Sequence, residues 1–463
     1  MTDDDARWEL WPYQDTGAQF LAARKFALLA DAMGVGKSAQ AVRATDIVFA
    51  QRILVVCPAI ARINWAREFH KFSFIGPDVT ICAKLSDKPG RQGVTICSYD
   101  YAAEAKRQLS TEKWDVLILD EAHFLKSMQA ARTKAILGKK GLAHSAGQTW
   151  LLTGTPMTNH AGDLWPMLFV SGVTQKKYAE FIKHFCSGYD AGFGFKITGV
   201  KNVPELKALL GKIMLRRRKE DVVKDLPPIS FSTFAVEPGP VDLEIAMYDL
   251  WRRAGGDEKL KRVIDAQEAR VAEQIKALSK TKTPMRNLLP LMHGMQESLP
   301  ELRQYTGMAK TAAIIEMVKR ELDTPVEEGG IDKIVIFACH RVVIEAFRDA
   351  LRKYKAVTLY GGTPAEKRQG HIDHFQNHPR YRVFVANIAA AGTAITLTAA
   401  SEVIFAELDW TPANNAQAAM RVHRIGQTKP VRVRYAALAD STDEHLTETL
   451  RRKTRDELQI FGN

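Results

Sequence analysis

The chain has 463 residues and a formal net charge of +12, and its length predicts two to three domains with a sizeable core. Its 46% hydrophobic and 25% charged residues are typical of a soluble globular protein, and no run of about 18 apolar residues occurs, so we expect no membrane span. The basic balance suits a polyanionic partner such as nucleic acid without identifying one, and five scattered cysteines without a CxxC pair argue against zinc.

The start of the chain is acidic. Residues 1–5 lack the basic and apolar regions of a secretion signal. Four of the five cysteines lie in or beside apolar runs, as thiols do in a reducing compartment. We therefore expect a cytoplasmic protein.

Gln14 precedes an apolar helix predicted over 18–23. Its amide offers a donor and an acceptor together, which suits the edge of an adenine. Without a phosphate site downstream, a surface glutamine near a turn would be the simpler interpretation.

Residues 31–38, DAMGVGKS, lie between a short apolar run at 26–30 and a helix predicted over 39–50. Strand, glycine loop, Lys-Ser and helix together form the context that a phosphate-binding loop requires. Asp31 stands where such a loop usually has its first glycine. The loop alone therefore leaves a chance glycine turn as an equal alternative.

Each residue of the loop has a role in phosphate binding. Gly34 and Gly36, with Val35 between them, let the backbone point its N–H groups at an anion, and the following helix adds its positive N-terminal end. Lys37 would neutralise the β- and γ-phosphates of a nucleotide. The Ser38 hydroxyl would hold Mg²⁺.

Strands are predicted over 53–57 and 94–99, with a helix over 61–72 between them. Trp65 and Phe69 are four residues apart in this helix, a spacing that predicts core packing.

A second candidate site follows residues 116–119, VLIL, whose apolar run indicates a central parallel strand. Ligands bind at the carboxyl ends of such strands, where Asp120, Glu121 and His123 follow here. Two adjacent carboxylates are costly without a cation, and Mg²⁺ removes that cost. Asp120 would complete the metal shell begun by Ser38, and Glu121 would polarise the attacking water.

Two further features leave alternatives open. A strand predicted over 149–153 leads into Thr153 and Thr155, which either couple the γ-phosphate to another surface or simply end the strand in a turn. The basic cluster at 216–219 either contacts phosphate or forms a solvated or ion-paired helix face.

The second half repeats an α/β pattern without a phosphate loop. It is preceded by a helical, aromatic stretch from 164 to about 212 and by charged, helix-rich residues 241–322. Its alternation fits a parallel sheet with right-handed crossovers. Strands are predicted over 333–339, 356–360, 382–387, 402–406 and 431–436, with helices over 342–353 and 364–375.

The third candidate site is residues 415–427, NAQAAMRVHRIGQ. On a helix, Gln417, Arg421 and Arg424 would share one face. Two arginines beside a glutamine suit a γ-phosphate arriving from another domain, where they can be worth roughly 10³ to 10⁵ in rate. Taken alone, the pattern fits a solvated basic face better.

With these sites together, the chain resembles the Swi/Snf-type ATPases of helicase superfamily 2. The LRRRK-x-DV and RxxRIGQ forms belong to this branch, and residues 403–412, VIFAELDWTP, most resemble its annealing-helicase members. The matching segments are, in order, WPYQ, DAMGVGKS, VVCPAIARINWAREFHKF, TICSYD, LILDEAHFLKS, LLTGTPMTN, LRRRKEDVVKDLPP and QAAMRVHRIGQ.

The resemblance implies an α/β fold of two RecA-like parallel-sheet lobes with helical protrusions and ATP bound between the lobes. The first lobe would span 1–235, with a protrusion at about 164–212. The second would span 236–463, with a protrusion at about 241–300, the arginine fingers and a C-terminal helix.

The resemblance also implies the residue roles. It places Gln14 on adenine and makes Arg421 and Arg424 the arginine fingers of the second lobe. The candidate catalytic residues are Lys37, Asp120, Glu121, Arg421 and Arg424. The candidate nucleotide-binding residues are Gln14, Gly34, Val35, Gly36, Lys37, Ser38, His123 and Gln417, and the candidate metal ligands are Ser38 and Asp120.

The usual activity of this family is ATP-driven tracking along double-stranded DNA. We therefore expect ATP and Mg²⁺ as cofactors, double-stranded DNA (also branched or single-stranded) as the partner, and a monomer of bacterial or viral origin without membrane association. The alternatives are a strand-separating DNA or RNA helicase, and a nucleic-acid-binding regulator with a decayed ATP site.

The chain departs from the family pattern at two places. The loop reads Asp-Ala-Met in place of Asp-Glu-Met. Residues 391–397 carry Ala394 and Thr396 where a glycine and an asparagine are usual. In the family, the second segment normally helps to couple DNA binding to ATP hydrolysis.

Overall fold

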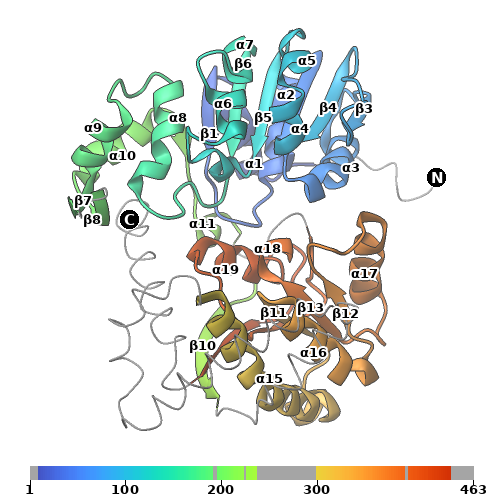
Figure 1. The fold of residues 1–463 in the computed structure, drawn as a ribbon. Helices are drawn as coiled ribbons and strands as arrows, with labels where there is room; N and C mark the ends of the chain where they lie inside the picture. Colours follow the sequence, from blue (N-terminus) through green and yellow to red (C-terminus); the bar gives the residue numbers. More distant parts are fainter. Residues whose placement is uncertain (1–8, 191–194, 224–225, 237–298, 392–394, 439–463) are drawn as a thin grey trace, which may run out of the picture.

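The computed structural model describes residues 9–190, 195–223, 226–236, 299–391 and 395–438, and these build two parallel sheets, one above the other in Figure 1. The first sheet has seven strands in the order β3-β4-β2-β5-β6-β1-β9. They are β1 (Phe26–Leu29), β2 (Arg52–Cys57), β3 (Val79–Cys82), β4 (Gly93–Ser98), β5 (Val116–Asp120), β6 (Gln148–Leu152) and β9 (Met214–Leu215). The helices around them are α1 (Pro12–Ala22), α2 (Lys37–Ile47), α3 (Arg62–Phe72), α4 (Tyr99–Glu104), α5 (Lys106–Ser110), α6 (Ala131–Leu137) and α7 (Leu142–Ser145).

This sheet is covered on both faces, which explains its continuous apolar strands. In β2, Leu54 and Val56 join the core on one face, while Ile53 and Val55 join the core on the other. In β5, residues 116–119 are all fully buried. The strands predicted over 53–57, 94–99, 116–119 and 149–153 are confirmed, as are the helices at 39–50 and 61–72 to within a few residues.

The second sheet has six parallel strands in the order β10-β15-β14-β11-β13-β12. Its strands are β10 (Ile229–Val236), β11 (Ile334–Ala338), β12 (Val357–Leu359), β13 (Val383–Asn387), β14 (Glu402–Phe405) and β15 (Val431–Leu438). Its helices are α15 (Leu299–Asp323), α16 (Arg341–Ala350), α17 (Ala365–Asn377), α18 (Ile388–Ala391) and α19 (Pro412–Ala419). All five strands predicted for this half are confirmed, and so is the overall class of two parallel-sheet lobes.

The boundary predicted between 235 and 236 cuts through β10. This strand pairs in parallel with β15 over all eight of its residues, from Ile229 to Val236, and so belongs to the second sheet. Its mixed polar sequence, ISFSTFAV, gave no signal, because a strand at a sheet edge is only partly buried. The change of lobe therefore lies before Ile229.

A protrusion stands beside the first lobe, at the left of Figure 1. It has its own apolar core, which includes Phe181, Phe185 and Leu206. The prediction of helix is wrong over 186–190 and 195–200, where two strands pair antiparallel with a register shift between Ser187 and Gly188. Its elements are α8 (Trp165–Val170), α9 (Tyr178–Phe185), β7 (Cys186–Asp190), β8 (Phe195–Val200) and α10 (Val203–Gly211).

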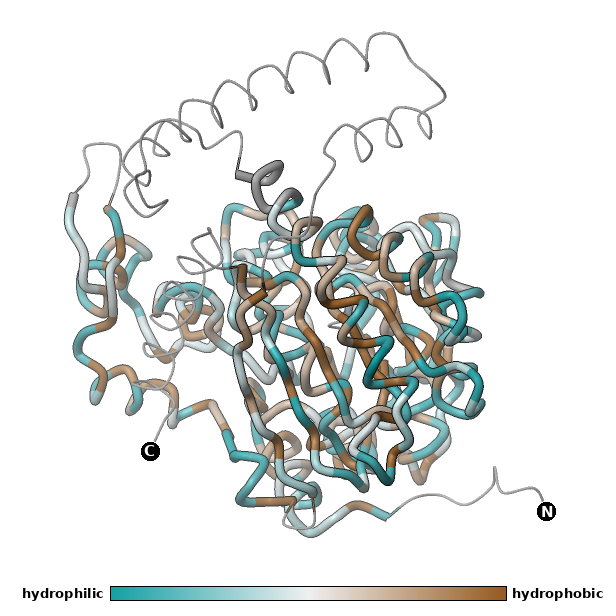
Figure 2. The backbone as a smooth tube through the Cα atoms, turned by 90° about the horizontal axis from the view of Figure 1, so that it is seen from below, coloured by the Kyte–Doolittle hydropathy of each residue, from teal (hydrophilic) through white to brown (hydrophobic). Residues whose placement is uncertain are grey.

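Two predicted elements fall outside the described residues. They are the C-terminal helix and nearly all of the protrusion at 241–300. Among the described residues, no helix combines the length and apolar character needed to cross a bilayer. Figure 2 shows hydrophobic positions running along strands in the middle of the molecule.

The two lobes face each other through loops and short helices. In Figure 1, α18 and α19 lie at the edge of the second lobe that faces the first, and α11 (Lys219–Val222) lies between the lobes. The carboxyl ends of β1 and β5, which carry the predicted phosphate loop and Asp120, belong to the first lobe. The candidate site is therefore built where these two edges meet.

Candidate nucleotide site between the lobes

The phosphate loop connects β1 to α2 and contains two left-handed glycines. Gly34 has φ +81° and Gly36 has φ +80°, a conformation that residues with a Cβ rarely adopt. A Cβ on Gly36 would collide with the Gln14 amide, and one on Gly34 would lie 3.1 Å from the Arg424 Cβ. The loop is thus approached closely by α1 on one side and by the second lobe on the other.

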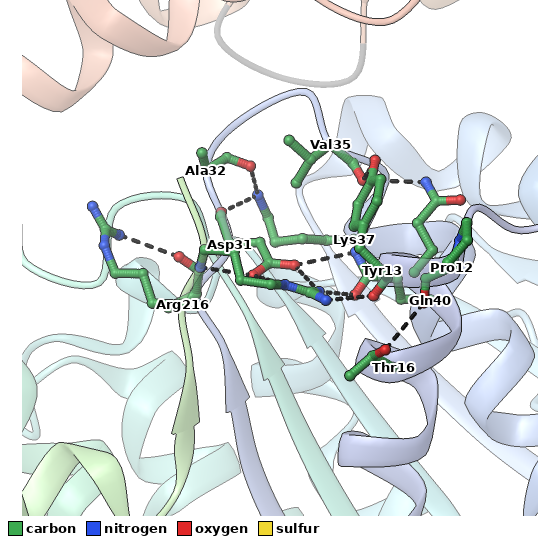
Figure 3. A network of polar contacts seen from close by, with 12 residues as sticks. Pro12, Tyr13, Thr16, Asp31, Ala32, Val35, Lys37, Gln40 and Arg216 are labelled. Atoms are coloured by element: carbon green, nitrogen blue, oxygen red, sulfur yellow. Dashed lines mark hydrogen bonds and ion pairs between the residues drawn. The ribbon is translucent and has the colours of Figure 1, made fainter. Parts of the chain in front are cut away.

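Lys37 is the first residue of α2, and its ammonium folds back onto the loop. Nζ donates hydrogen bonds to the carbonyl oxygens of Asp31 at 2.8 Å and Ala32 at 3.0 Å (Figure 3). Burial lowers the pKa of Lys37, and the charges of Glu121, Asp31 and Asp120 oppose that effect. Its partners among the described residues that lie within hydrogen-bonding distance are neutral carbonyls, so phosphate oxygens can replace them.

Gln14 lies against the same loop. It is 5% exposed, and its Nε2 donates to the Val35 carbonyl at 3.2 Å. The Tyr13 hydroxyl donates to that carbonyl at 3.0 Å. This arrangement keeps the amide next to the phosphate loop, where a base attached to bound phosphates would lie.

Asp120 ends β5 and is held by two donors. The Trp65 indole donates to Oδ2 at 2.8 Å and the Glu121 backbone N–H to Oδ1 at 3.0 Å. Burial, and then the neighbouring charge of Glu121, raise the pKa of Asp120 to about 6. Trp65 therefore does more than pack in the core, since it also orients this carboxylate.

Glu121 has a left-handed backbone, with φ 51° and ψ 51°. Such a conformation costs about 1 kcal/mol for a residue with a side chain and tends to occur at functional sites. Burial raises the pKa of Glu121, but His123, Arg421 and Lys37 outweigh burial, so the pKa is lowered overall. The carboxylate is therefore ionised and ready to accept a proton or orient water.

The Glu121 carboxylate also contacts both lobes. Its Oε2 lies 3.3 Å from His123 Nδ1, and its Oε1 accepts a hydrogen bond from the Gln417 side chain of the second lobe. His123 Nδ1 also lies 3.2 Å from the Thr153 hydroxyl, which joins this group to the end of β6.

The helix predicted over 415–427 is wrong beyond residue 419. α19 ends at Ala419, and residues 420–427, which we call the arginine turn, continue in bends with Gly426 at φ +96°. The Arg421 carbonyl accepts a hydrogen bond from the Leu397 N–H at 2.9 Å, a tertiary contact that a continuous helix would not allow. Of Gln417, Arg421 and Arg424, only Gln417 therefore lies on the helix.

Both arginines nevertheless reach the first lobe. The Arg424 Cβ lies over Gly34, and its Nη1 donates to the Thr396 hydroxyl at 2.9 Å. Burial, and then the charge of Arg424, lower the pKa of Arg421 to about 10, while the carboxylates of Glu121 and Asp120 oppose this change. Thr396, one of the departures from the family pattern, is thus in contact with a candidate finger.

The three arginines of the basic cluster lie in three different environments. Arg217 forms an ion pair with Asp31, which is fully buried, and also donates to the Tyr13 carbonyl and to Gln40. Arg218 is exposed and pairs with Asp221.

Arg216 contacts the first lobe through backbone carbonyls. Its Nη1 donates to the carbonyl of Ala30 at 3.2 Å (Figure 3) and to that of Gly154 at 3.3 Å. Sequence reasoning missed the support that Arg216 and Arg217 give to the loop, although Asp31, the partner of Arg217, was a possible signal because it replaces a glycine.

The residues present fit a nucleotide with Mg²⁺. Ser38 and Asp120 supply hard oxygen donors, and a bound cation would offset the burial and the Glu121 charge that raise the pKa of Asp120. In the part of the chain that the structure describes, no three His, Cys, Asp or Glu side chains form a metal cluster. A cation here would complete its shell with phosphate oxygens and water, as Mg²⁺ commonly does.

Two protein-family models match most of the chain. Residues 13–293 match the SNF2-related domain, and residues 310–426 match the helicase conserved C-terminal domain.

Several curated proteins are similar over almost the whole chain. The SWI/SNF-related matrix-associated actin-dependent regulator of chromatin subfamily A-like protein 1 homolog of Caenorhabditis elegans is 32% identical over 98% of this chain and 61% of its own length. The corresponding Drosophila melanogaster protein is 31% identical over 96% of this chain and 55% of its own length. The DNA annealing helicase and endonuclease ZRANB3 of Mus musculus is 29% identical over 98% of this chain and 41% of its own length.

The chain spans 61% of the length of the first of these relatives and less of the others. Among solved structures, the Sulfolobus solfataricus SWI2/SNF2 ATPase core in complex with dsDNA is 23% identical, with a TM-score of 0.45, over 99% of this chain and 94% of that one.

Proposed function

Because the chain belongs to the SNF2-related family, we propose that it is an ATP-dependent motor that couples ATP hydrolysis to movement on double-stranded DNA. The observation that carries this proposal is the meeting of the two lobes at one point. Gln417 of the second lobe donates to Glu121 of the first, and Arg424 lies over Gly34 of the phosphate loop.

The first lobe supplies the groups that would hold the nucleotide. The backbone N–H groups of the loop and the Lys37 ammonium would bind the β- and γ-phosphates, with Gln14 beside the adenine. Ser38 and Asp120 would hold Mg²⁺, which supplies neutralisation of the phosphate charge. Trp65 keeps the Asp120 carboxylate in one orientation through its indole N–H.

The hydrolytic step would depend on Glu121 and the two arginines. The lowered pKa keeps Glu121 ionised, so it can orient water and take up its proton. Gln417 and His123 contact this carboxylate and hold it in place. Arg421 and Arg424 would stabilise the charge that develops on the transferred phosphate.

Movement along DNA would result because the phosphate loop and the two arginines belong to different lobes. Closure brings the arginine turn onto the phosphate loop, and loss of the γ-phosphate after hydrolysis removes the anion between them. Contacts to DNA phosphates would make the binding tolerant of sequence and sensitive to salt, which the net charge of +12 supports.

The partner and setting are part of the same proposal. The name of one relative, a DNA annealing helicase, supports DNA as the substrate. Four of the five cysteines are buried, which supports a reducing, cytoplasmic setting, and we infer a monomer.

The test is an ATPase assay with duplex DNA, single-stranded DNA and RNA side by side, followed by displacement of a third strand from a duplex. We expect the strongest stimulation by duplex DNA and ATP-dependent displacement, with Lys37→Ala as the inactive control. A preference for single strands or RNA would support the strand-separating helicase instead. If no nucleic acid stimulates hydrolysis and none occurs without it, the remaining interpretation is a nucleic-acid-binding regulator with a decayed ATP site.

A further inference from the structure

Lys219 is a buried cation that the roles above do not use. It begins α11, directly after the segment that runs beside the phosphate loop. In that segment the Leu215 carbonyl accepts from the Ala30 N–H at 2.8 Å, and the Arg217 carbonyl accepts from the Ala32 N–H at 3.0 Å. The Arg217–Asp31 ion pair adds a side-chain anchor. Lys219 is therefore attached to the first lobe.

The Lys219 ammonium lies between the phosphate loop and the arginine turn. A Cβ on Gly34 would be 3.4 Å from Nζ. Nζ donates to the His423 carbonyl, lies 3.3 Å from His423 Nδ1 and lies 3.7 Å from the Met420 sulfur. The side chain of Lys219 is 7% exposed and joins the main chain of the second lobe to the first.

The two ring nitrogens of His423 face different partners, Lys219 on one side and the Pro227 carbonyl on the other. Its Nε2 lies 2.7 Å from the Pro227 carbonyl, which only accepts, so Nε2 carries the proton. Burial lowers the pKa of His423, which keeps the ring neutral and leaves Nδ1 as an acceptor that faces Lys219. The turn is thus held from two sides, by Lys219 and by the connection between the lobes.

The surroundings of Lys219 are unfavourable for its charge. Burial, followed by the charges of Arg424 and Lys37, lowers the pKa of Lys219 to about 7, while the charge of Glu220 opposes this change. Among the described residues, its hydrogen-bonding partners are neutral groups of His423 and the Met420 sulfur. A buried cation whose partners in the described part of the chain are all neutral costs stability, so its presence beside the phosphate loop calls for a functional reason.

We propose that Lys219 is a positioning residue that holds the arginine turn on the phosphate loop before the nucleotide binds, so that Arg421 and Arg424 are already in place. This inference rests on the proposed function for the role of the two arginines. The Lys219 contact reaches the backbone carbonyl of the turn itself, whereas Gln417 contacts Glu121 from α19. It therefore restrains the main chain that carries both guanidinium groups.

The test measures lobe closure without nucleotide in Lys219→Met, which removes the charge and keeps most of the volume. Dyes are attached to cysteines introduced at the exposed positions Glu104 and Asp373, with Cys339→Ser in every variant, and energy transfer is recorded. We expect the ratio of closed to open molecules to fall roughly 10-fold, as for the loss of a charge-assisted hydrogen bond. The matched control is Arg218→Met, which removes an exposed cation of the same segment and should leave the ratio unchanged.

Two further readouts separate positioning from a general structural role. A saturating non-hydrolysable ATP analogue should restore closure in Lys219→Met, and the KM for ATP should rise roughly 10-fold while kcat falls less. Lys219→Arg, which keeps a charged donor, should recover much of the closure. If Lys219→Met does not fold, Lys219→Gln takes its place.

A closed fraction equal to that of the Arg218→Met control would overturn the proposal. So would a loss of closure that the ATP analogue does not restore. Closure without nucleotide is measured in the absence of both ATP and turnover, so the comparison of Lys219→Met with Arg218→Met is independent of the proposed function. A parent protein without ATPase activity on any nucleic acid would refute that function and leave the closure measurement valid.

Discussion

Glu121 shows how single residues determine this site. Its backbone is left-handed, its carboxylate receives Gln417 from the opposite lobe, and cationic neighbours lower its pKa despite burial. The motif indicated a carboxylate at the end of a strand. The strain and the contact from the other lobe became visible only in the structure.

We predict that Glu121→Gln retains ATP binding but lowers kcat by roughly 10²- to 10⁴-fold, because an amide cannot take up the proton of the attacking water. The amide oxygen can still accept from Gln417, so the lobes should close as in the parent. Measurements of turnover and of equilibrium nucleotide binding check both parts. Turnover equal to that of the parent would remove Glu121 from the mechanism.

Lys219 predicts a pH dependence of stability. Its pKa in the folded chain, about 7, is below the ordinary value of 10.5, so the unfolded chain binds more protons between these values. The contribution of Lys219 to the free energy of unfolding should therefore rise as the pH increases from about 7 toward 10.5, and it should stay constant at its lowest value below pH 7. Denaturant unfolding of the parent and of Lys219→Met between pH 6 and pH 9 tests this prediction. The free energy of unfolding of the parent, relative to that of Lys219→Met, should be greater at pH 9 than at pH 6.

At the scale of elements, the phosphate loop is supported by a strand far away in the sequence. β9 pairs with β1, and the residues that follow it continue alongside the loop to Arg217, whose partner Asp31 is 186 positions earlier. Asp31 replaces the usual glycine of the loop and provides a buried carboxylate for this anchor. The departure from the common loop pattern thus has a structural reason.

Arg217→Met should lower the free energy of unfolding by about 3 kcal/mol, because it leaves the buried Asp31 carboxylate without its partner. Nucleotide affinity should fall as well, since the loop loses its anchor. Denaturant unfolding and nucleotide binding measure the two effects. Arg218→Met, whose side chain is 55% exposed, is the control and should change neither. Equal stability of the two variants would contradict a structural role for the pair.

At the scale of the whole molecule, the site exists only when both lobes contribute. The contact between Gln417 and Glu121 joins residues 296 positions apart, and Arg424 approaches Gly34 from the second sheet. A closed pair of lobes with its arginines at the loop is the arrangement that a nucleotide-driven motor requires. Opening would separate the arginines from the loop.

Arg421→Ala tests the division of labour between lobes. We predict a loss of kcat of roughly 10³-fold or more with a much smaller change in the KM for ATP, because the loop and Lys37 remain intact. Steady-state kinetics with saturating duplex DNA measure both constants. A defect confined to nucleotide affinity, with normal kcat, would exclude the finger role.

Local patterns were sufficient to predict the two parallel sheets, the glycine loop between β1 and α2 and the acidic end of β5. Glycine spacing, apolar runs and adjacent carboxylates report interactions within a few residues, and these persist in any compatible fold. The assignment of β10 to the second sheet, the antiparallel pairing of β7 with β8 and the end of α19 at Ala419 depended on contacts that sequence patterns do not report. The roles of Arg217 and Lys219 likewise followed from folding, because a basic cluster acquires distinct environments only when other parts of the chain surround it.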